Sequence, residues 1–303
     1  MALGRELIRK IYELMEEFVF EGELYTIPEY DLKLAEEYFE VYTFAMNLFV
    51  EEGDAINWLE VKDEIETLVI MPRLVTDILE ENFFDGKMPI IFSSATLSIQ
   101  KDFTYIADSL GIDDFQSFSV PSPFDYEDTM KIFKHPLEQK DKFSRVYDLF
   151  STGDQTLVLF KSKMDMDNFK RSLPLDHHYA IEFEGDRELS TVVKDFQEGK
   201  FQILCSYHLW EGLDLPGEAL TKVIIVDLPF PPQDPVFEAK RRFSNNPLEE
   251  IDLPFMQLRI QQGIGRLIRT SSDHGEIHLL LNEEELAVQH LWDKILPVPA
   301  ENF

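Results

Sequence analysis

A glutamine and two arginines recur at helical spacing near the C-terminal end of the chain, and these side chains suit a polyphosphate. At about 100° per residue, Gln262, Arg266 and Arg269 fall on one face of a helix. A guanidinium offers forked donors that match phosphate oxygens. Gly263 and Gly265 each cost a helix interior roughly 1 kcal/mol relative to Ala, which indicates that something approaches this face closely. The alternative is a surface helix whose arginines are simply solvated.

The opposite face of the same segment is apolar. Ile260, Ile264, Leu267 and Ile268 recur at the spacing of a buried helix face. The pattern predicts one helix over Phe255–Arg269, with its polar face turned outward.

Upstream of this helix, short apolar runs alternate with helical patterns from about residue 145 onward. The predicted strands are 157–160, 179–183, 202–206, 222–226 and 276–281, and the predicted helices between them are 164–173, 189–196 and 235–243. This alternation predicts an α/β fold with a mostly parallel, doubly wound sheet. Ligands of such sheets bind outside the carboxyl ends of the strands.

The N-terminal part has a different pattern. Residues 1–52 predict two helices joined by a turn near Gly22 and Pro28, and residues 57–71 read as extended. Helical spacing returns at 74–79. A short strand is predicted at 88–92, a helix at 101–110 and a linker near 121–123.

One loop at a predicted strand end carries two carboxylates. Glu211 and Asp214 flank Gly212, directly after Trp210. A carboxylate at a strand end could accept from a ribose hydroxyl or orient an arginine. The alternative is a polar turn anchored by a buried tryptophan.

Hydroxyl and lysine side chains follow two further predicted strands. Lys161 and Ser162 come after residues 157–160, where they could contact phosphate together with a helix N-terminus. Ser94 and Thr96 come after residues 88–92 and could bridge a nucleotide site to a neighbouring domain. In both places the alternative is an ordinary helix cap.

Composition excludes several classes. No apolar run approaches a membrane span, no signal-peptide pattern opens the chain, and the histidines show no metal spacing. The single cysteine, Cys205, lies in a predicted strand and is expected to be a buried small hydrophobe; it rules out an internal disulfide. We therefore expect a cytoplasmic protein with no membrane partner and no metal site of its own.

The chain is strongly acidic, with a formal net charge of −30 over 303 residues. The first 90 residues hold 22 acidic and 7 basic side chains, so half of the excess lies there. Such a surface repels a phosphate backbone, and unaided non-specific nucleic-acid binding is not the default expectation. A local basic groove remains compatible with this net charge.

The order of these segments resembles the C-terminal half of a DinG-type DNA helicase, in the XPD-like branch of superfamily 2. Residues 93–97, 157–162, 210–217 and 262–269 are similar to helicase motifs III, IV, V and VI in that order. The resemblance runs from about Trp58 to about Leu281, although Lys161 stands where relatives usually have threonine.

The resemblance implies a RecA-like fold and a domain order. Residues 1–56 would end a helical arch-like insertion, 57–115 would close the first RecA-like domain, and 116–303 would form the second. In this family ATP and its Mg²⁺ sit between the two RecA-like domains, and the motor moves 5′→3′ on single-stranded DNA.

The resemblance also implies roles for individual residues. Arg269 and Arg266 would contact the γ-phosphate, with Arg269 as the better arginine-finger candidate, and Gln262 would help place the attacking water. The nucleotide would be lined by Glu211, Gly212, Asp214 and Gly265. Single-stranded DNA would lie towards Ser162, Lys161, Ser94 and Thr96.

Half of such a motor is not encoded in these residues. The phosphate-cradling pattern G-x-x-x-x-G-K-[ST] and the Asp-Glu-Ala-His box do not occur, because Gly86-Lys87 and Gly199-Lys200 both lack the required neighbours. In the family these motifs, with the Mg²⁺ ligands and the cysteines of any iron–sulfur cluster, lie upstream. We expect an N-terminal ATPase half as partner, in cis or as a separate chain, and no helicase-like ATP hydrolysis by this chain alone. Two alternatives are a non-enzymatic acidic interaction protein and an exonuclease-linked enzyme, although no clustered nuclease carboxylates occur.

Overall fold

A computed structural model describes residues 6, 9–10, 12–13, 16, 29–50, 55–62, 64–72, 76, 79–84, 89–176, 178–211 and 220–303. The chain divides into two compact units. The first contains residues 1–89, 109–112 and 233–243, and the second contains 90–108, 113–232 and 244–303. The domain boundaries expected at residues 56 and 115 stay predictions.

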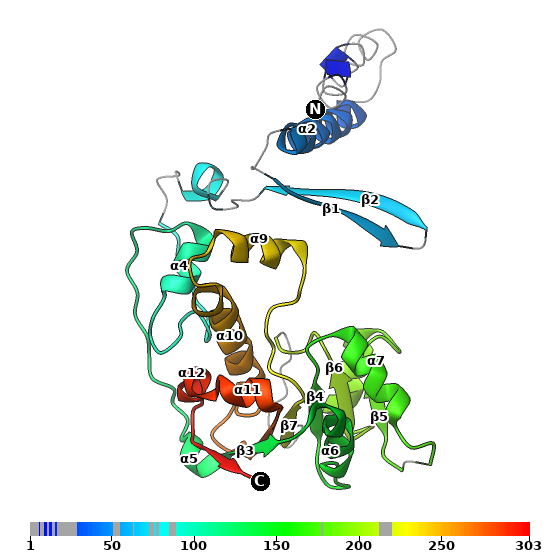
Figure 1. The fold of residues 1–303 in the computed structure, drawn as a ribbon, viewed down its shortest axis with the longest axis vertical. Coiled ribbons are helices and arrows are strands. Elements are labelled where there is room, and N and C mark those ends of the chain that lie inside the picture. The colour runs from blue at the N-terminus through cyan, green and yellow to red at the C-terminus, as the bar shows by residue number, and fades with distance from the viewer. Residues whose placement is uncertain are drawn as a thin grey trace. The chain divides into compact units, whose positions relative to one another are not determined.

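The second unit is built on a seven-stranded sheet in the order β5-β6-β4-β7-β8-β3-β9 (Figure 1). Every neighbouring pair in this sheet is parallel. The strands are β3 (Met130–Pro136), β4 (Thr156–Leu159), β5 (Ile181–Phe183), β6 (Ile203–Ser206), β7 (Lys222–Ile225), β8 (Gly275–Leu281) and β9 (Ala300–Asn302). The parallel, doubly wound sheet predicted from the sequence is confirmed.

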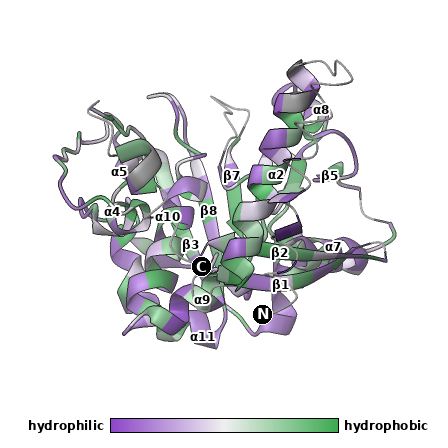
Figure 2. Ribbon diagram, turned by 90° about the horizontal axis from the view of Figure 1, so that it is seen from above, coloured by the Kyte–Doolittle hydropathy of each residue, from purple (hydrophilic) through white to green (hydrophobic). Residues whose placement is uncertain are grey.

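Helices cover both faces of this sheet because alternate strand residues point to opposite sides. In β4, Leu157 and Leu159 join one apolar core, whereas Val158 joins the other. The first core includes residues of α8 (Leu189–Gln197), α10 (Leu253–Ile264) and α12 (Gln289–Trp292), and the second includes residues of α6 (Lys142–Asp148) and α7 (Lys163–Ser172). Cys205 is buried in the second core, as predicted. Strand β7 has three apolar residues after Lys222, and the helices carry both hydrophobic and hydrophilic residues (Figure 2).

Short elements complete the second unit. They are α4 (Thr104–Leu110), α5 (Tyr126–Thr129), η2 (Gln139–Asp141), η4 (Leu248–Asp252), α11 (Glu283–Ala287) and η5 (Asp293–Ile295). Helix α4 is shorter than the helix predicted at 101–110, because it begins only at Thr104. Its last two residues belong to the first unit.

The first unit contains a long helix and a β-hairpin. Helix α2 (Glu29–Val50) and the antiparallel strands β1 (Ala55–Lys62) and β2 (Ile65–Pro72) match the predicted helix and extended segment. Helices α2 and α9 (Pro235–Phe243) both contact the hairpin, and η1 spans Glu80–Phe84. The turn expected near Gly22 and Pro28 lies outside the described residues.

Two predicted elements differ from the structure. Helix α10 ends at Ile264 and not at Arg269, because Gly265 forms its C-cap and the chain turns there. Residues 89–92 form no strand, and Ile91 is 88% exposed. An apolar strand needs hydrogen-bonded neighbours on its sheet, and none of the described strands pairs with this segment.

The sequence analysis missed several elements of the second unit, among them β3, α6 and β9. Strand β3 lies between β8 and β9, helix α6 lies on one face, and β9 closes one edge. Lysines interrupt the apolar positions of β3, and β9 is only three residues long. Both features weaken the periodic signal on which strand prediction rests.

Candidate functional site

Trp210 connects the loop that follows β6 to the rest of the site. Its indole is fully buried, and its Nε1 donates to the Phe160 carbonyl at 3.0 Å, at the end of β4. The sequence left open whether this loop is a turn anchored by a buried tryptophan. The structure shows that anchor, and it fixes where the following residue, the exposed Glu211, leaves the sheet.

Arg266 ties the end of α10 to the same loop. Its Nε and Nη2 both donate to the Trp210 carbonyl oxygen, at 3.0 and 2.8 Å. The residue is buried, and these charge-assisted bonds offset part of the cost of taking a guanidinium out of water. Arg266 therefore joins the two sequence segments that were predicted to act together.

Gln262 and Glu211 meet beside this contact. Gln262 Nε2 donates to Glu211 Oε2 at 3.3 Å, at the open edge of the site. The structure thus brings together three of the predicted site residues, Gln262, Glu211 and Arg266, around the backbone of Trp210.

Arg259 belongs to the same group and was missed by the sequence analysis. Its guanidinium lies 5.4 Å from the centre of the Trp210 ring and 5.6 Å from that of Phe255. Burial lowers the pKa of Arg259, while the nearby charge of Glu211 opposes that shift. The sequence offered one signal that could have identified Arg259. It lies three residues before Gln262 and seven before Arg266, which places all three side chains on one helix face.

Arg269 lies beyond the end of α10, on a turn held by a buried carboxylate. Asp273 accepts from the backbone N–H of Arg269 at 2.7 Å and of Thr270 at 2.8 Å. The Thr270 hydroxyl donates to its other oxygen at 2.5 Å. Arg269 is exposed, so Asp273 fixes the backbone from which an exposed guanidinium extends.

The two glycines of this segment, Gly263 and Gly265, differ in their surroundings. A Cβ on Gly263 would lie 3.0 Å from Trp210 Cε3 and 3.2 Å from Leu159 Cδ1. The close approach predicted from this glycine therefore exists, but the group that approaches is the tryptophan ring and not a phosphate. Gly265 is exposed and forms the C-cap of α10 with φ −63°, a conformation open to any residue, so the helix end does not itself require glycine.

The residues after β4 form a second group of polar side chains. Ser162 caps α7: its hydroxyl accepts from Asp165 N at 3.2 Å, which is one of the two roles left open. Lys161 Nζ lies 3.9 Å from Asp227 Oδ1, and its side chain is 44% exposed.

Asp227 belongs to a buried network of charges at the same edge of the sheet. Lys142 Nζ, fully buried, lies 2.8 Å from Asp227 Oδ1 and 2.6 Å from Glu285 Oε2. Glu285 also accepts from the backbone N–H of Leu228 at 2.7 Å and of Asn282 at 2.8 Å. The network holds the chain that follows β7 and β8 next to Lys161.

Of the remaining predicted residues, two contact each other and two lie outside the described part of the chain. Thr96 N donates to Ser94 Oγ at 3.3 Å in an exposed turn, and the next helix begins only at Thr104, so neither residue caps it. Gly212 and Asp214 lie outside the described residues.

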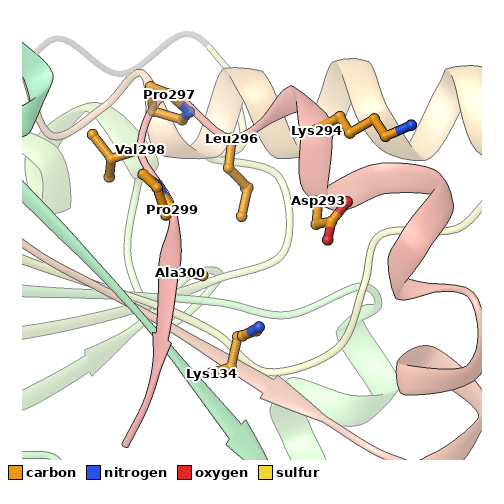
Figure 3. Close-up of a pocket in the computed structure, with 8 residues that line it drawn as sticks. All are labelled: Lys134, Asp293, Lys294, Leu296, Pro297, Val298, Pro299 and Ala300. Carbon is orange, nitrogen blue, oxygen red and sulfur yellow. The ribbon is translucent and has the colours of Figure 1, made fainter.

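A pocket of about 450 Å³ lies elsewhere, beside β3 and β9 (Figure 3). It is lined by Lys134, Asp293, Lys294, Leu296, Pro297, Val298, Pro299 and Ala300. None of the predicted site residues lines it. Within the described part of the chain, no three His, Cys, Asp or Glu side chains are grouped to hold a metal ion, and no helix is long and apolar enough to cross a membrane.

Comparison with known proteins gives consistent matches. Residues 147–287 match the family described as helicase C-terminal domain. The chain is 46% identical to the probable ATP-dependent helicase YpvA of Bacillus subtilis (strain 168) over 299 residues, which are 97% of this chain and 46% of that protein. It is 29% identical over 267 residues to the 3′-5′ exonuclease DinG of the same organism, covering 77% of this chain and 28% of that protein. The chain thus spans less than half the length of these two relatives.

Two solved structures share the fold. An XPD helicase superposes with a TM-score of 0.62 at 17% identity, over 88% of this chain and 50% of that chain. An apo XPD structure gives 0.60 at 18% identity, over 95% of this chain and 62% of that chain.

The parallel sheet with helices on both faces defines a RecA-like α/β domain of the helicase type. Residues 147–287 are thus a helicase C-terminal domain, and over nearly its whole length the chain is similar to the probable ATP-dependent helicase YpvA.

Proposed function

We propose that this chain is the C-terminal half of a DinG-type ATP-dependent DNA helicase motor. The observation that supports it most is the double hydrogen bond from Arg266 to the Trp210 carbonyl. It joins the end of α10 to the loop after β6, so a nucleotide phosphate and its hydrolysis could be sensed by both segments. The names of the curated relatives supply the reaction, ATP-dependent unwinding of DNA.

The arginines take different roles in this proposal. Arg269, exposed on a turn braced by Asp273, acts as the arginine finger, which stabilises charge spread over the transferring phosphoryl oxygens. Arg266 is buried against Trp210 and fixes the wall of the site from which Gln262 and Glu211 face the nucleotide. Gln262 helps orient the attacking water.

The residues fit a phosphate and not a cation. Exposed cationic and amide side chains suit γ-phosphate oxygens. Glycine at 265 lets a phosphate approach the backbone, and Gly212 and Asp214 would line the same nucleotide. The Mg²⁺ that accompanies ATP would take its ligands from an N-terminal ATPase half, because the described residues offer no grouped metal ligands.

The proposal also contains a DNA side. Lys161 and Ser162, at the end of β4, would contact the phosphates of single-stranded DNA, and Ser94 and Thr96 would couple DNA to nucleotide. The buried Lys142–Asp227–Glu285 network supports this edge, because Asp227 lies close to Lys161.

A two-part ATPase experiment tests the proposal. The purified chain is assayed for DNA-stimulated ATP hydrolysis, alone and joined to the N-terminal remainder of the B. subtilis helicase YpvA. We expect activity only in the joined protein. In that protein, Arg269→Ala should lower kcat at least roughly 100-fold and leave single-stranded DNA affinity nearly unchanged. Arg171→Ala, at an exposed arginine of α7, is the matched control and should change neither quantity.

Two results would contradict this assignment. DNA-stimulated hydrolysis by the 303-residue chain alone would show that it is a complete motor. Normal turnover of the Arg269→Ala protein with a large loss of DNA affinity would place Arg269 on the DNA and not on the nucleotide.

The second candidate is a non-enzymatic acidic interaction protein, which the net charge of −30 favours. Titration of the chain with a fluorescent ATP analogue and with labelled single-stranded DNA separates the two, since an interaction protein of this kind would bind neither.

A further inference from the structure

A buried carboxylate at the end of β5 holds an aromatic pair at the end of β6, the half-buried Tyr207 and the exposed His208. Glu184 is only 8% exposed. Its Oε2 accepts from Ser206 Oγ at 2.5 Å and from the backbone N–H groups of Tyr207 and His208, both at 3.1 Å. Its Oε1 pairs with His208 Nδ1 at 2.6 Å. Burial alone would raise the pKa of Glu184, but the hydrogen bonds from Ser206 and His208 lower it.

The group that this carboxylate orients lies on the surface. The His208 side chain is 65% exposed, and its ring centre lies 4.0 Å from that of Tyr207. Tyr207 itself packs against the core below the sheet. Glu184 accepts hydrogen bonds from four donors, which is more than an exposed histidine needs to be held in a stable fold. Its effect is to fix the position of an aromatic surface.

The position of this pair points to a nucleic-acid ligand. Strands β4 and β6 are parallel neighbours (Figure 1). Because Leu159 pairs with Ser206, His208 follows β6 at the same edge of the sheet at which Lys161 and Ser162 follow β4. Proteins that bind single strands without sequence preference combine cationic side chains along the backbone, as Lys161 would be, with aromatic rings on which bases stack.

The local charges favour a base over a phosphate as the ligand of His208. Glu184 offsets any charge on the imidazole, and Asp167 pairs with Lys163 at 2.6 Å. A phosphate would meet little net positive charge at this ring, whereas a nucleobase needs only an oriented π-face.

We propose that the Tyr207–His208 pair is a stacking platform for a nucleobase of single-stranded DNA, held in place by Glu184. The inference rests on the proposed function, because it assumes that a single strand passes this edge of the sheet. It adds a base contact to the phosphate contacts at Lys161 and Ser162.

The test measures binding of the whole chain to a labelled single-stranded oligonucleotide and to an abasic oligonucleotide of equal length, by fluorescence anisotropy. Base stacking on an aromatic side chain is typically sufficient for a roughly 5- to 100-fold change in affinity. We expect His208→Ala to weaken binding of the intact oligonucleotide by that factor and to leave the abasic one unchanged. His208→Phe, which keeps a ring, should retain most of the affinity, and His290→Ala, at an exposed histidine of α12, is the control.

Three results would overturn the proposal. If the wild-type chain binds neither oligonucleotide, the proposed function fails together with the platform. If it binds both but His208→Ala has no effect, the platform alone fails. If Ala and Phe weaken intact and abasic binding equally, His208 contacts the phosphate backbone and not a base.

Discussion

Replacing the buried Lys142 by methionine should be among the most destabilising single changes in the second unit. Lys142 is fully buried between Asp227 and Glu285, 2.8 and 2.6 Å from their oxygens. Methionine fills a similar volume but leaves two carboxylates facing each other without the cation. Breaking a buried ion pair from one side typically costs about 3–5 kcal/mol.

The remaining partners of the carboxylates place the cost at the lower end of that range. Asp227 keeps the donated hydrogen bond of Gln139 at 3.1 Å and the charge of Lys161 at 3.9 Å. Glu285 keeps two backbone N–H donors. We therefore expect a loss of about 3 kcal/mol in the free energy of unfolding, measured by urea denaturation with tryptophan fluorescence.

Lys140→Met provides the matched control for this experiment. Lys140 lies two residues away, its side chain is 74% exposed, and it pairs with Glu138 at 2.7 Å. Such surface pairs contribute about 0–1 kcal/mol. The double change Lys142→Met with Asp227→Asn should cost less than the sum of the two single changes, because one of the facing charges is removed. A loss below about 1 kcal/mol for Lys142→Met would refute the reasoning.

Two further changes have defined outcomes. Gly263→Val should destabilise the second unit by about 1–3 kcal/mol in urea, because even a Cβ would lie 3.0 Å from Trp210 Cε3; Gly153→Val, where a Cβ meets nothing within 4 Å, is the control, and equal losses would contradict this cause. Burial, with neighbouring positive charges, lowers the pKa of both His135 and His278 from 6.5 to about 4. The folded state therefore binds protons less readily than the unfolded chain, so stability is full above about pH 6.5 and falls as pH drops towards 4, by about 1.4 kcal/mol per unit of pKa shift. Urea midpoints at several pH values measure this loss, which should shrink in His278→Gln; an unchanged pH dependence in that variant would exclude the histidine pair as its source.

The parts of the fold that were predictable from sequence are those with a local signal. Strands β4, β6 and β7 are fully buried, and their apolar runs stand out between helical patterns. Strand β3 is also an interior strand of the sheet, between β8 and β9, but it carries Lys131 and Lys134, so its pattern resembles a surface segment. The length of α10 was overestimated, because apolar spacing continues through Leu267 and Ile268 although the helix has ended.

The candidate site was predictable in its residue types and less so in its contacts. Gln262, Arg266 and Glu211 were identified from spacing and strand ends, and the structure brings them together. Arg259 was missed because its importance depends on the Trp210 ring, which comes from a distant part of the sequence. Contacts of this kind depend on tertiary packing, and no periodicity within a single segment reports them.

The buried indole of Trp210 also provides an intrinsic fluorescence signal from the candidate site. The three tryptophans lie in different parts of the chain: Trp58 in β1 of the first unit, Trp292 in the core beneath α10, and Trp210 at the site. Only Trp210 has a carbonyl that binds Arg266 and a ring that lies near Arg259. A protein that keeps Trp210 and carries phenylalanine at the other two positions would therefore emit from this loop alone. Its emission would follow any rearrangement of the arginines in real time, without a label.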